Sequence, residues 1–279
     1  MSATVVVPRR DFLRGTLGFS AMLLLPDAAR ATPRSVREAV VEELVTANRI
    51  LTTEGIVDGF GHISRRDPER QDRFLMARAR APGLVEEGDI LEFDLSGAPI
   101  DAGGRRTYIE RFIHAAIYSA RPDVNSIIHD HSKGLLPFTV SKRPLRALTA
   151  QGAPFDTGVP VWDVRDKFGD STAMAVTNME MGQDLARALG SGPAVLMRGH
   201  GAVLAGPSIR TAVLLAIMIE TEASVQIEAL KLGDLTYLSP GEIKMTRAII
   251  DPNERSGSAN RLWEEWCRKA GRPFVEKGY

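Results

Sequence analysis

Cysteine is almost absent from this sequence of 279 residues: Cys267 is the only one, so no disulfide can form within the chain. An excess of charge of one sign is also missing, because 35 lysine and arginine residues balance 35 aspartate and glutamate residues. Without a basic block to attract a polyanion, the sequence predicts no nucleic-acid partner. Long hydrophobic runs are missing as well. The N-terminal apolar stretch of about ten residues is too short to span a bilayer, so no permanent membrane anchor is expected.

The first 31 residues differ in character from the rest of the chain. Arg9 and Arg10 precede the apolar stretch 16–25, and Ala29-Arg30-Ala31 offers small residues at the spacing of a cleavage site. This order is similar to a twin-arginine export signal, which implies a periplasmic protein that is exported already folded. The alternative is an ordinary basic N-terminus followed by an amphipathic helix, and such a protein would stay in the cytoplasm.

The rest of the chain fits one domain at residues 32–250 and a C-terminal tail at 251–279. Ser35 and Glu38 have capping-box spacing ahead of a helical apolar periodicity. The patterns predict helices over 36–54, 108–120, 178–190 and 208–232, and strands over 74–77, 90–95, 124–131, 194–197 and 202–205. They also predict a glycine-rich turn over 59–64 and a loop-like stretch over 140–176. Interleaved helices and strands predict a layered α/β domain.

Two histidines separated by one residue, His129 and His131, follow the apolar run 126–128 at the end of a predicted strand. Because side chains alternate along a strand, both imidazoles are expected on one side. Glu110 lies upstream on a predicted helix, and His200 lies downstream in a tight Gly-His-Gly turn. A lone strand histidine is usually a buried core residue. Three imidazoles and one carboxylate, however, form the donor set of a catalytic divalent cation, with zinc expected first and manganese second.

The order and spacing of these four residues resemble the class II aldolase/adducin family, in which a helical Glu, a His-x-His on the next strand and a distant His bind a divalent metal. Residues 121–124, Arg-Pro-Asp-Val, also look like the family, and the resemblance covers roughly residues 36–245. It implies a three-layer αβα domain with a central mixed, mostly antiparallel sheet. It also implies an assembly, usually a homotetramer, with its sites at subunit boundaries.

The same resemblance implies a carbon–carbon lyase. A divalent cation acts as a Lewis acid and stabilises the enolate left when a carbon–carbon bond breaks. Glu110 would be a catalytic proton shuttle or a ligand that leaves when the substrate arrives, although it could instead be a surface residue paired with Arg111 or Arg106. His114 lies four residues after Glu110, and we expect it to support the metal ligands rather than to replace Glu110 as a ligand.

Two segments depart from the sugar-phosphate members, which hold phosphate with small residues. Here the corresponding segments contain His62 and Ser64 in the first and Arg78 and Arg80 in the second. We expect these four residues to bind substrate. Arg78 and Arg80 would share one face of an extended segment, and a guanidinium suits a carboxylate, although both could be solvated residues on an edge strand. A carboxylate-bearing small-molecule substrate is therefore expected.

Several alternatives stay open from the sequence. Family members that look like this chain include decarboxylases of hydroxylated aromatic or pyridine carboxylic acids, but decarboxylation and aldol cleavage differ only in the leaving carbon. A non-catalytic, adducin-like interaction module would lack the four ligands, all of which are present. An epimerase acting on a sugar phosphate would need the phosphate-binding turn. Trp162, Trp263 and Trp266 are expected in the core or in subunit contacts.

Overall fold

The structure is a computed structural model that describes residue 1 and residues 34–156, 158–249 and 258–276. The segment predicted as an export signal lies almost entirely outside the described residues, so that prediction stays a prediction. Within the described part, no helix combines the length and apolar character needed to cross a bilayer.

A seven-stranded sheet forms the centre of the domain at residues 34–279. Its strand order is β3-β2-β1-β4-β7-β6-β5, and every neighbouring pair is antiparallel except β5 and β6. The predicted mixed, mostly antiparallel sheet is confirmed. The strands are β1 (His62–Arg66), β2 (Arg73–Ala77), β3 (Ile90–Asp94), β4 (Ser126–Asp130), β5 (Val161–Trp162), β6 (Ala194–Met197) and β7 (Gly201–Gly206).

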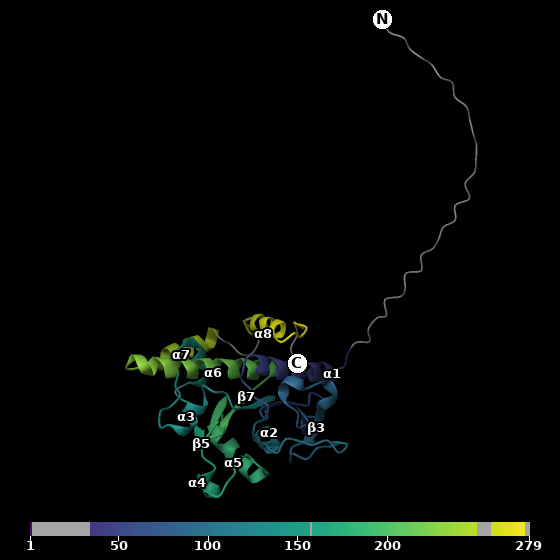
Figure 1. The fold of residues 1–279 in the computed structure, drawn as a ribbon, viewed down its shortest axis with the longest axis horizontal. Coiled ribbons are helices and arrows are strands. Elements are labelled where there is room, and N and C mark those ends of the chain that lie inside the picture. Colours follow the sequence, from purple (N-terminus) through teal and green to yellow (C-terminus); the bar gives the residue numbers. More distant parts are fainter. Residues whose placement is uncertain (2–33, 157, 250–257, 277–279) are drawn as a thin grey trace, which may run out of the picture. The chain divides into compact units, whose positions relative to one another are not determined.

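Helices cover both faces of the sheet and complete three layers (Figure 1). One layer contains α1 (Val36–Thr53), α6 (Ile209–Leu232) and α8 (Ser258–Lys269), and the other contains α2 (Arg111–Ala120) and α5 (Met179–Leu189). Three further helices are α3 (Leu136–Val140), α4 (Arg165–Phe168) and α7 (Pro240–Ile249). Short 3-10 helices occur at Pro82–Leu84, Glu87–Asp89 and Ala150–Phe155.

Helices α1, α5 and α6 begin within one residue of their predicted starts. Ser35 forms the expected capping box with Glu38 at the start of α1, and the side chains of Asn178 and Ser208 cap α5 and α6. These side chains satisfy backbone N–H groups that have no partner within the first turn of a helix.

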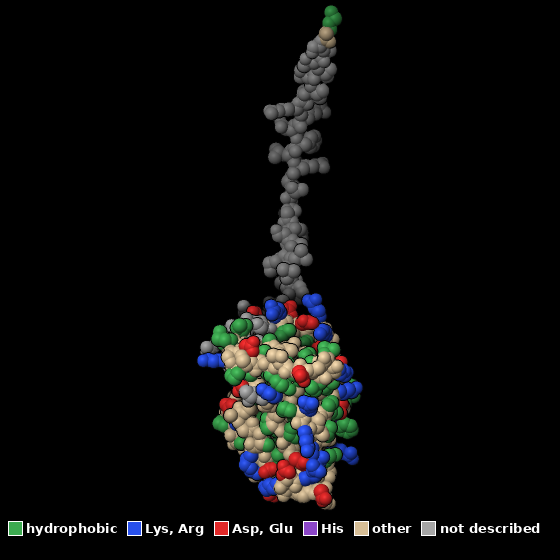
Figure 2. All heavy atoms as spheres, turned by 90° about the vertical axis from the view of Figure 1, so that its left-hand side faces the viewer, with side chains coloured by type: hydrophobic (Ala, Val, Ile, Leu, Met, Phe, Trp, Pro, Cys, Tyr) green, Lys and Arg blue, Asp and Glu red, His purple; other side chains and the backbone are tan. Residues whose placement is uncertain are grey.

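Charged side chains of both signs are interspersed on the molecular face shown in Figure 2.

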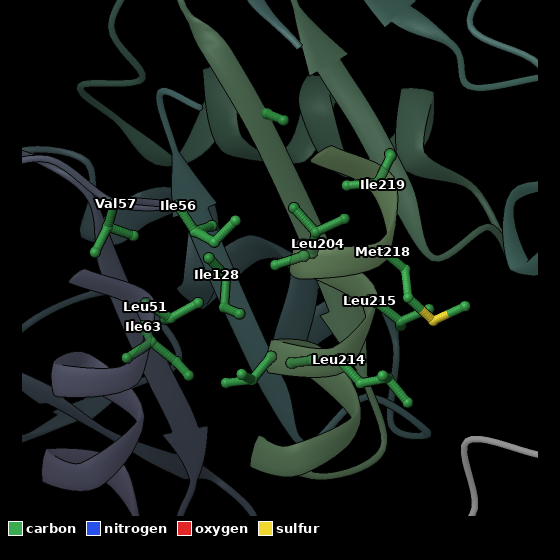
Figure 3. Close-up of a cluster of buried hydrophobic side chains, with 14 of the residues drawn as sticks. Leu51, Ile56, Val57, Ile63, Ile128, Leu204, Leu214, Leu215, Met218 and Ile219 are labelled. Atoms are coloured by element: carbon green, nitrogen blue, oxygen red, sulfur yellow. The ribbon is translucent and has the colours of Figure 1, made fainter. Parts of the chain in front are cut away.

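The alternation of side chains along the strands divides the core in two. Ile128 and Leu204 pack toward α6 (Figure 3), whereas their neighbours Ile127 and Val203 pack toward α2 and α5. The same alternation determines the direction of the polar residue that follows on β4. His129 therefore lies on the α2 side of the sheet, with Ile127.

Several boundaries differ from the predictions. α2 begins at Arg111 rather than 108, so Glu110 precedes the helix, and His131 lies just after the end of β4. The predicted turn over 59–64 is wrong in its second half, because β1 begins at His62 and pairs with β4. The stretch 140–176 contains β5 and α4, and the predicted tail contains α8. Trp162, Trp263 and Trp266 belong to the core.

Candidate metal centre and adjoining pocket

Four side chains from separate parts of the chain converge on one point. Glu110, His129, His131 and His200 each offer a ligand atom, and these atoms all lie within 4.8 Å of one another. This is the set predicted from the sequence. Zinc binds nitrogen and oxygen atoms at about 2.1 Å, so a single cation would need only a small inward shift of any donors that lie at the limit of this range.

Each donor is carried by the end of an element. Glu110 is the residue before α2, His129 lies on β4, His131 follows β4, and His200 lies in the turn between β6 and β7. Gly199 precedes this turn residue with a φ of 67°, a conformation that glycine adopts without strain. Because β4 pairs with β7, the turn that holds His200 is brought beside the His-x-His segment.

The inward-facing atoms are the Nε2 atoms of the histidines and Oε2 of Glu110. Glu110 Oε2 lies 3.2 Å from His129 Nε2 and 3.5 Å from His200 Nε2, and the Nε2 atoms of His129 and His131 are 3.2 Å apart. Within the described part of the chain, neither Arg106 nor Arg111, the alternative partners of Glu110, forms an ion pair with it. Arg111 instead donates to the carbonyl oxygens of Gly97 and Tyr108.

The outward-facing atoms of the same side chains are held by groups around the cluster. His129 Nδ1 lies 3.0 Å from the carbonyl oxygen of Ala202, His200 Nδ1 lies 2.8 Å from that of Met174, and His131 Nδ1 lies 3.1 Å from Asp58. Each acceptor favours a proton on Nδ1, which leaves the Nε2 lone pair free to bind a cation. The other Glu110 oxygen, Oε1, accepts a hydrogen bond from Val176 N.

The electrostatic environment favours an ionised Glu110. Burial alone would raise the pKa of this carboxyl, but the neighbouring His129 and His200 hold it well below its usual value. Burial and the nearby His129 lower the pKa of His131. Burial lowers the pKa of His129, but the Glu110 carboxylate raises it more, so the net direction is upward. A divalent metal, which binds a carboxylate and neutral imidazoles, would take the place of a proton on this ring.

A buried chain of hydrogen bonds lies beside the cluster. His62 Nδ1 is 2.7 Å from His114 Nε2, His114 Nδ1 is 2.6 Å from Ser64 Oγ, and this hydroxyl is 2.8 Å from the Tyr118 hydroxyl. Burial lowers the pKa of His114 to about 3, and burial and the proximity of His114 lower the pKa of His62, so both rings are neutral. Both nitrogens of His114 are engaged, which fits a supporting role and leaves neither nitrogen for a metal.

A cavity of about 490 Å³ adjoins the cluster, and Glu110 and His62 are part of its lining. The side chain of Ser64 is fully buried behind His62, so substrate binding by Ser64 gains no support from its position. Arg80 lines the cavity, but its guanidinium and that of Arg78 both bind Asp89. The two arginines share a face as predicted, and that face is already occupied by a carboxylate of the chain.

The sequence did not indicate the residues that orient the ligands. Asp58 precedes a glycine-rich turn, and its Oδ1 accepts hydrogen bonds from the backbone N–H groups of Phe60 and Gly61. The acceptors from Met174 and Ala202 are backbone carbonyl groups, which carry no signature in the residue type. Met174 has a φ of 62°, a conformation that a residue with a side chain rarely adopts.

We expect Asp58→Asn to weaken metal binding by about 10- to 100-fold, because the carboxylate that holds His131 Nδ1 is replaced by a weaker, neutral acceptor. The asparagine oxygen still accepts from the turn, so the fold is expected to persist. The affinity is measured by competition with a zinc chelator. Asp72→Asn, at an exposed residue paired with Arg70, serves as the control. Equal affinities of both variants for zinc would contradict the role of Asp58.

Comparisons with known proteins find a matching family model, several relatives and solved structures of similar fold. The family model for the Class II Aldolase and Adducin N-terminal domain matches residues 42–227. The chain is 31% identical over 252 residues to Decarboxylase tropJ of Talaromyces stipitatus, covering 82% of this chain and 93% of that protein. It is 30% identical over 210 residues to 3,4-dihydroxyphthalate decarboxylase of Arthrobacter keyseri, covering 69% and 79%. L-fuculose 1-phosphate aldolase from Glaciozyma antarctica superposes with a TM-score of 0.69 at 25% identity, covering 87% and 97%.

Proposed function

Because the chain belongs to the class II aldolase and adducin family, we propose that it is a metal-dependent carbon–carbon lyase that decarboxylates a hydroxylated aromatic carboxylic acid. The observation that carries this proposal is the convergence of three histidine Nε2 atoms and the Glu110 carboxylate beside a cavity. Two of the relatives are named decarboxylases, one of them for a dihydroxylated aromatic acid. Their names support decarboxylation over aldol cleavage.

In this proposal His129, His131, His200 and Glu110 hold a divalent cation, zinc first and manganese second. When bound, the cation supplies Lewis-acid stabilisation for the electron pair that a breaking carbon–carbon bond leaves on the substrate. The donor set fits such an ion, because its Nε2 lone pairs face inward and every Nδ1 has an acceptor outside the cluster. The non-catalytic alternative needs none of this arrangement.

Glu110 is proposed as the residue that moves the proton. Loss of CO2 leaves an electron pair on carbon, and that carbon must take up one proton, so the reaction needs a donor beside the substrate. Oε1 of Glu110 is fixed by Val176 N, whereas Oε2 faces the cluster at the edge of the cavity. Because Oε2 is also the atom that would bind the cation, it would have to leave the cation when the substrate arrives, and it would then carry a proton from solvent to the substrate carbon.

Three further properties are part of the proposal. We propose a homotetramer, as the family resemblance implies, a carboxylate-bearing substrate, and export by the twin-arginine route through residues 1–31. A cell fractionation that finds the full chain only in the cytosol would contradict export. The acidic substrate is supported by the arginine-containing lining of the cavity. Faster turnover of neutral substrates than of carboxylate-bearing ones would contradict it.

The reaction is tested with metal-loaded enzyme and a panel of hydroxylated aromatic acids, aldol sugars and pentulose phosphates. Release of CO2 and release of an aldehyde are measured separately, in the wild type and after removal of the metal with a chelator. We expect CO2 from at least one hydroxylated aromatic acid, loss of the activity without metal, and recovery when zinc or manganese is added. An aldehyde from a sugar phosphate would indicate the aldolase reaction, and an interconverted pentulose phosphate would indicate the epimerase.

A further inference from the structure

The cavity beside the metal centre contains one arginine that the chain itself leaves available. Arg80 and Arg106 both line this cavity. The guanidinium of Arg80 is bound to Asp89, and its backbone oxygen accepts a hydrogen bond from the hydroxyl of Tyr108. The guanidinium of Arg106 forms no hydrogen bond or ion pair with any residue that the structure describes. Arg106 is therefore the cation with which an incoming anion would not have to displace a partner.

The neighbouring Arg105 differs from Arg106, because its guanidinium is held by the backbone and has a structural role. Arg105 donates to the carbonyl oxygens of Ala102, Gly88 and Asp101 at 2.8, 2.9 and 3.2 Å. Among the described residues, Arg106 forms a hydrogen bond only through its backbone: its carbonyl oxygen accepts from Ala79 N at 2.8 Å. That hydrogen bond fixes the position of the residue on the cavity wall and leaves its side chain available.

Apolar side chains in the same lining indicate that the rest of the ligand is apolar. Phe60 and Ile109 line the cavity with 76% and 64% of their surface exposed, and the ring of Tyr108 lies with its centroid 4.5 Å from that of His62. Exposed aromatic and aliphatic surface at a cavity gains free energy when a flat apolar ring covers it. A polyhydroxylated sugar chain would gain less from such a wall than an arene.

We propose that Arg106 is the binding site for a carboxylate that the substrate keeps throughout the reaction, with the aromatic ring between Arg106 and the metal centre. The substrate class is then a hydroxylated aromatic dicarboxylate: one carboxylate is lost as CO2 and the other stays on Arg106. This proposal deepens the proposed function and rests on it for the identity of the reacting end. Arg106 acts as a specificity-determining residue through a charge-assisted hydrogen bond to the retained group.

Two ligands that lack the carboxylate proposed to leave as CO2 isolate the retained carboxylate. Catechol and 3,4-dihydroxybenzoate share the two hydroxyl groups and the ring, and differ only by one carboxylate. Their binding to zinc-loaded enzyme is measured by calorimetry for the wild type, Arg106→Gln, Arg106→Lys and the control Arg143→Gln, at an exposed arginine outside this cavity. We expect the wild type to bind 3,4-dihydroxybenzoate more tightly than catechol, and Arg106→Gln to weaken the first by about 10- to 100-fold while leaving catechol unchanged.

Arg106→Lys is expected to retain part of the discrimination, because it keeps the charge but not the planar pair of donors. Arg143→Gln is expected to behave as the wild type. Equal binding of the two ligands by the wild type, or an equal ratio in Arg106→Gln, would overturn the proposal. Displacement of 3,4-dihydroxybenzoate by inorganic phosphate at similar concentration would also overturn it, since the site would then be one for phosphate. Discrimination that depends on Arg106 without CO2 release from any acid would leave this site standing and refute the proposed reaction.

Discussion

Replacing His131 by alanine is expected to remove most of the bound metal and to lower kcat/KM by about 10³-fold or more, since the Lewis acid accounts for several kcal/mol of transition-state stabilisation. His131 is the most informative ligand to replace because it follows the end of β4 and its side chain is partly exposed, whereas His129 is completely buried in the sheet. Removal of His131 therefore takes away a donor without opening a large cavity in the core.

The metal content of the purified variant is measured by mass spectrometry beside the wild type. The control is Lys133→Ala, at an exposed position two residues along the chain. Unfolding of the metal-stripped proteins should give similar free energies for both variants and the wild type, which would separate loss of a ligand from loss of the fold. If His131→Ala retains a full equivalent of metal, the proposed centre is wrong.

The second large effect is expected at Gly201, which begins β7. A Cβ atom at this position would lie 2.1 Å from the carbonyl oxygen of Asp130 and 2.8 Å from the His131 ring. Neither backbone can move without breaking the pairing of β4 with β7. Gly201→Ala should therefore lower the free energy of unfolding by about 3 kcal/mol or more, at the upper end of the costs of overpacking. It should also weaken zinc binding, because the displaced strand carries His129.

Gly88→Ala is the matched control, since a Cβ atom there meets no atom within 4 Å and the residue does not require a positive φ. Chemical denaturation of the metal-free proteins measures the stability, and chelator competition measures the affinity for zinc. We expect Gly88→Ala to remain close to the wild type in both. A Gly201→Ala protein as stable as Gly88→Ala would mean that β4 and β7 are less closely packed than the structure indicates.

The metal donors could be predicted because their positions follow from local geometry. The two-residue repeat of a strand places His129 and His131 together, and the glycines on both sides of His200 indicate a tight turn after a buried strand. His200 is brought to the other two histidines by the pairing of β4 with β7, and Glu110 by the packing of α2 on the sheet. No strand order was predicted from the sequence, and the expectation that the four residues meet rested on their residue types and on the family resemblance.

The rest of the site depends on contacts between distant parts of the chain. Asp89 lies eleven residues after Arg78, and no pattern in the sequence indicates that it binds both Arg78 and Arg80. β1 was not predicted from the sequence, because its residues on the α2 side, His62 and Ser64, are polar although they are buried. An apolar alternation is the usual signal for such a strand. Their burial is compensated by hydrogen bonds to His114, which belongs to a different element.

The distribution of the four donors along the chain has a consequence for stability. They come from segments that are separated by as many as 90 residues, from Glu110 to His200, in a protein whose single cysteine allows no covalent tie between them. An ion held by all four would close long loops of the unfolded chain, as a disulfide does in secreted proteins, and would bind the native state alone. The same four side chains would thus form a non-covalent cross-link between distant segments of the domain, and the stability of the domain would depend on the supply of metal.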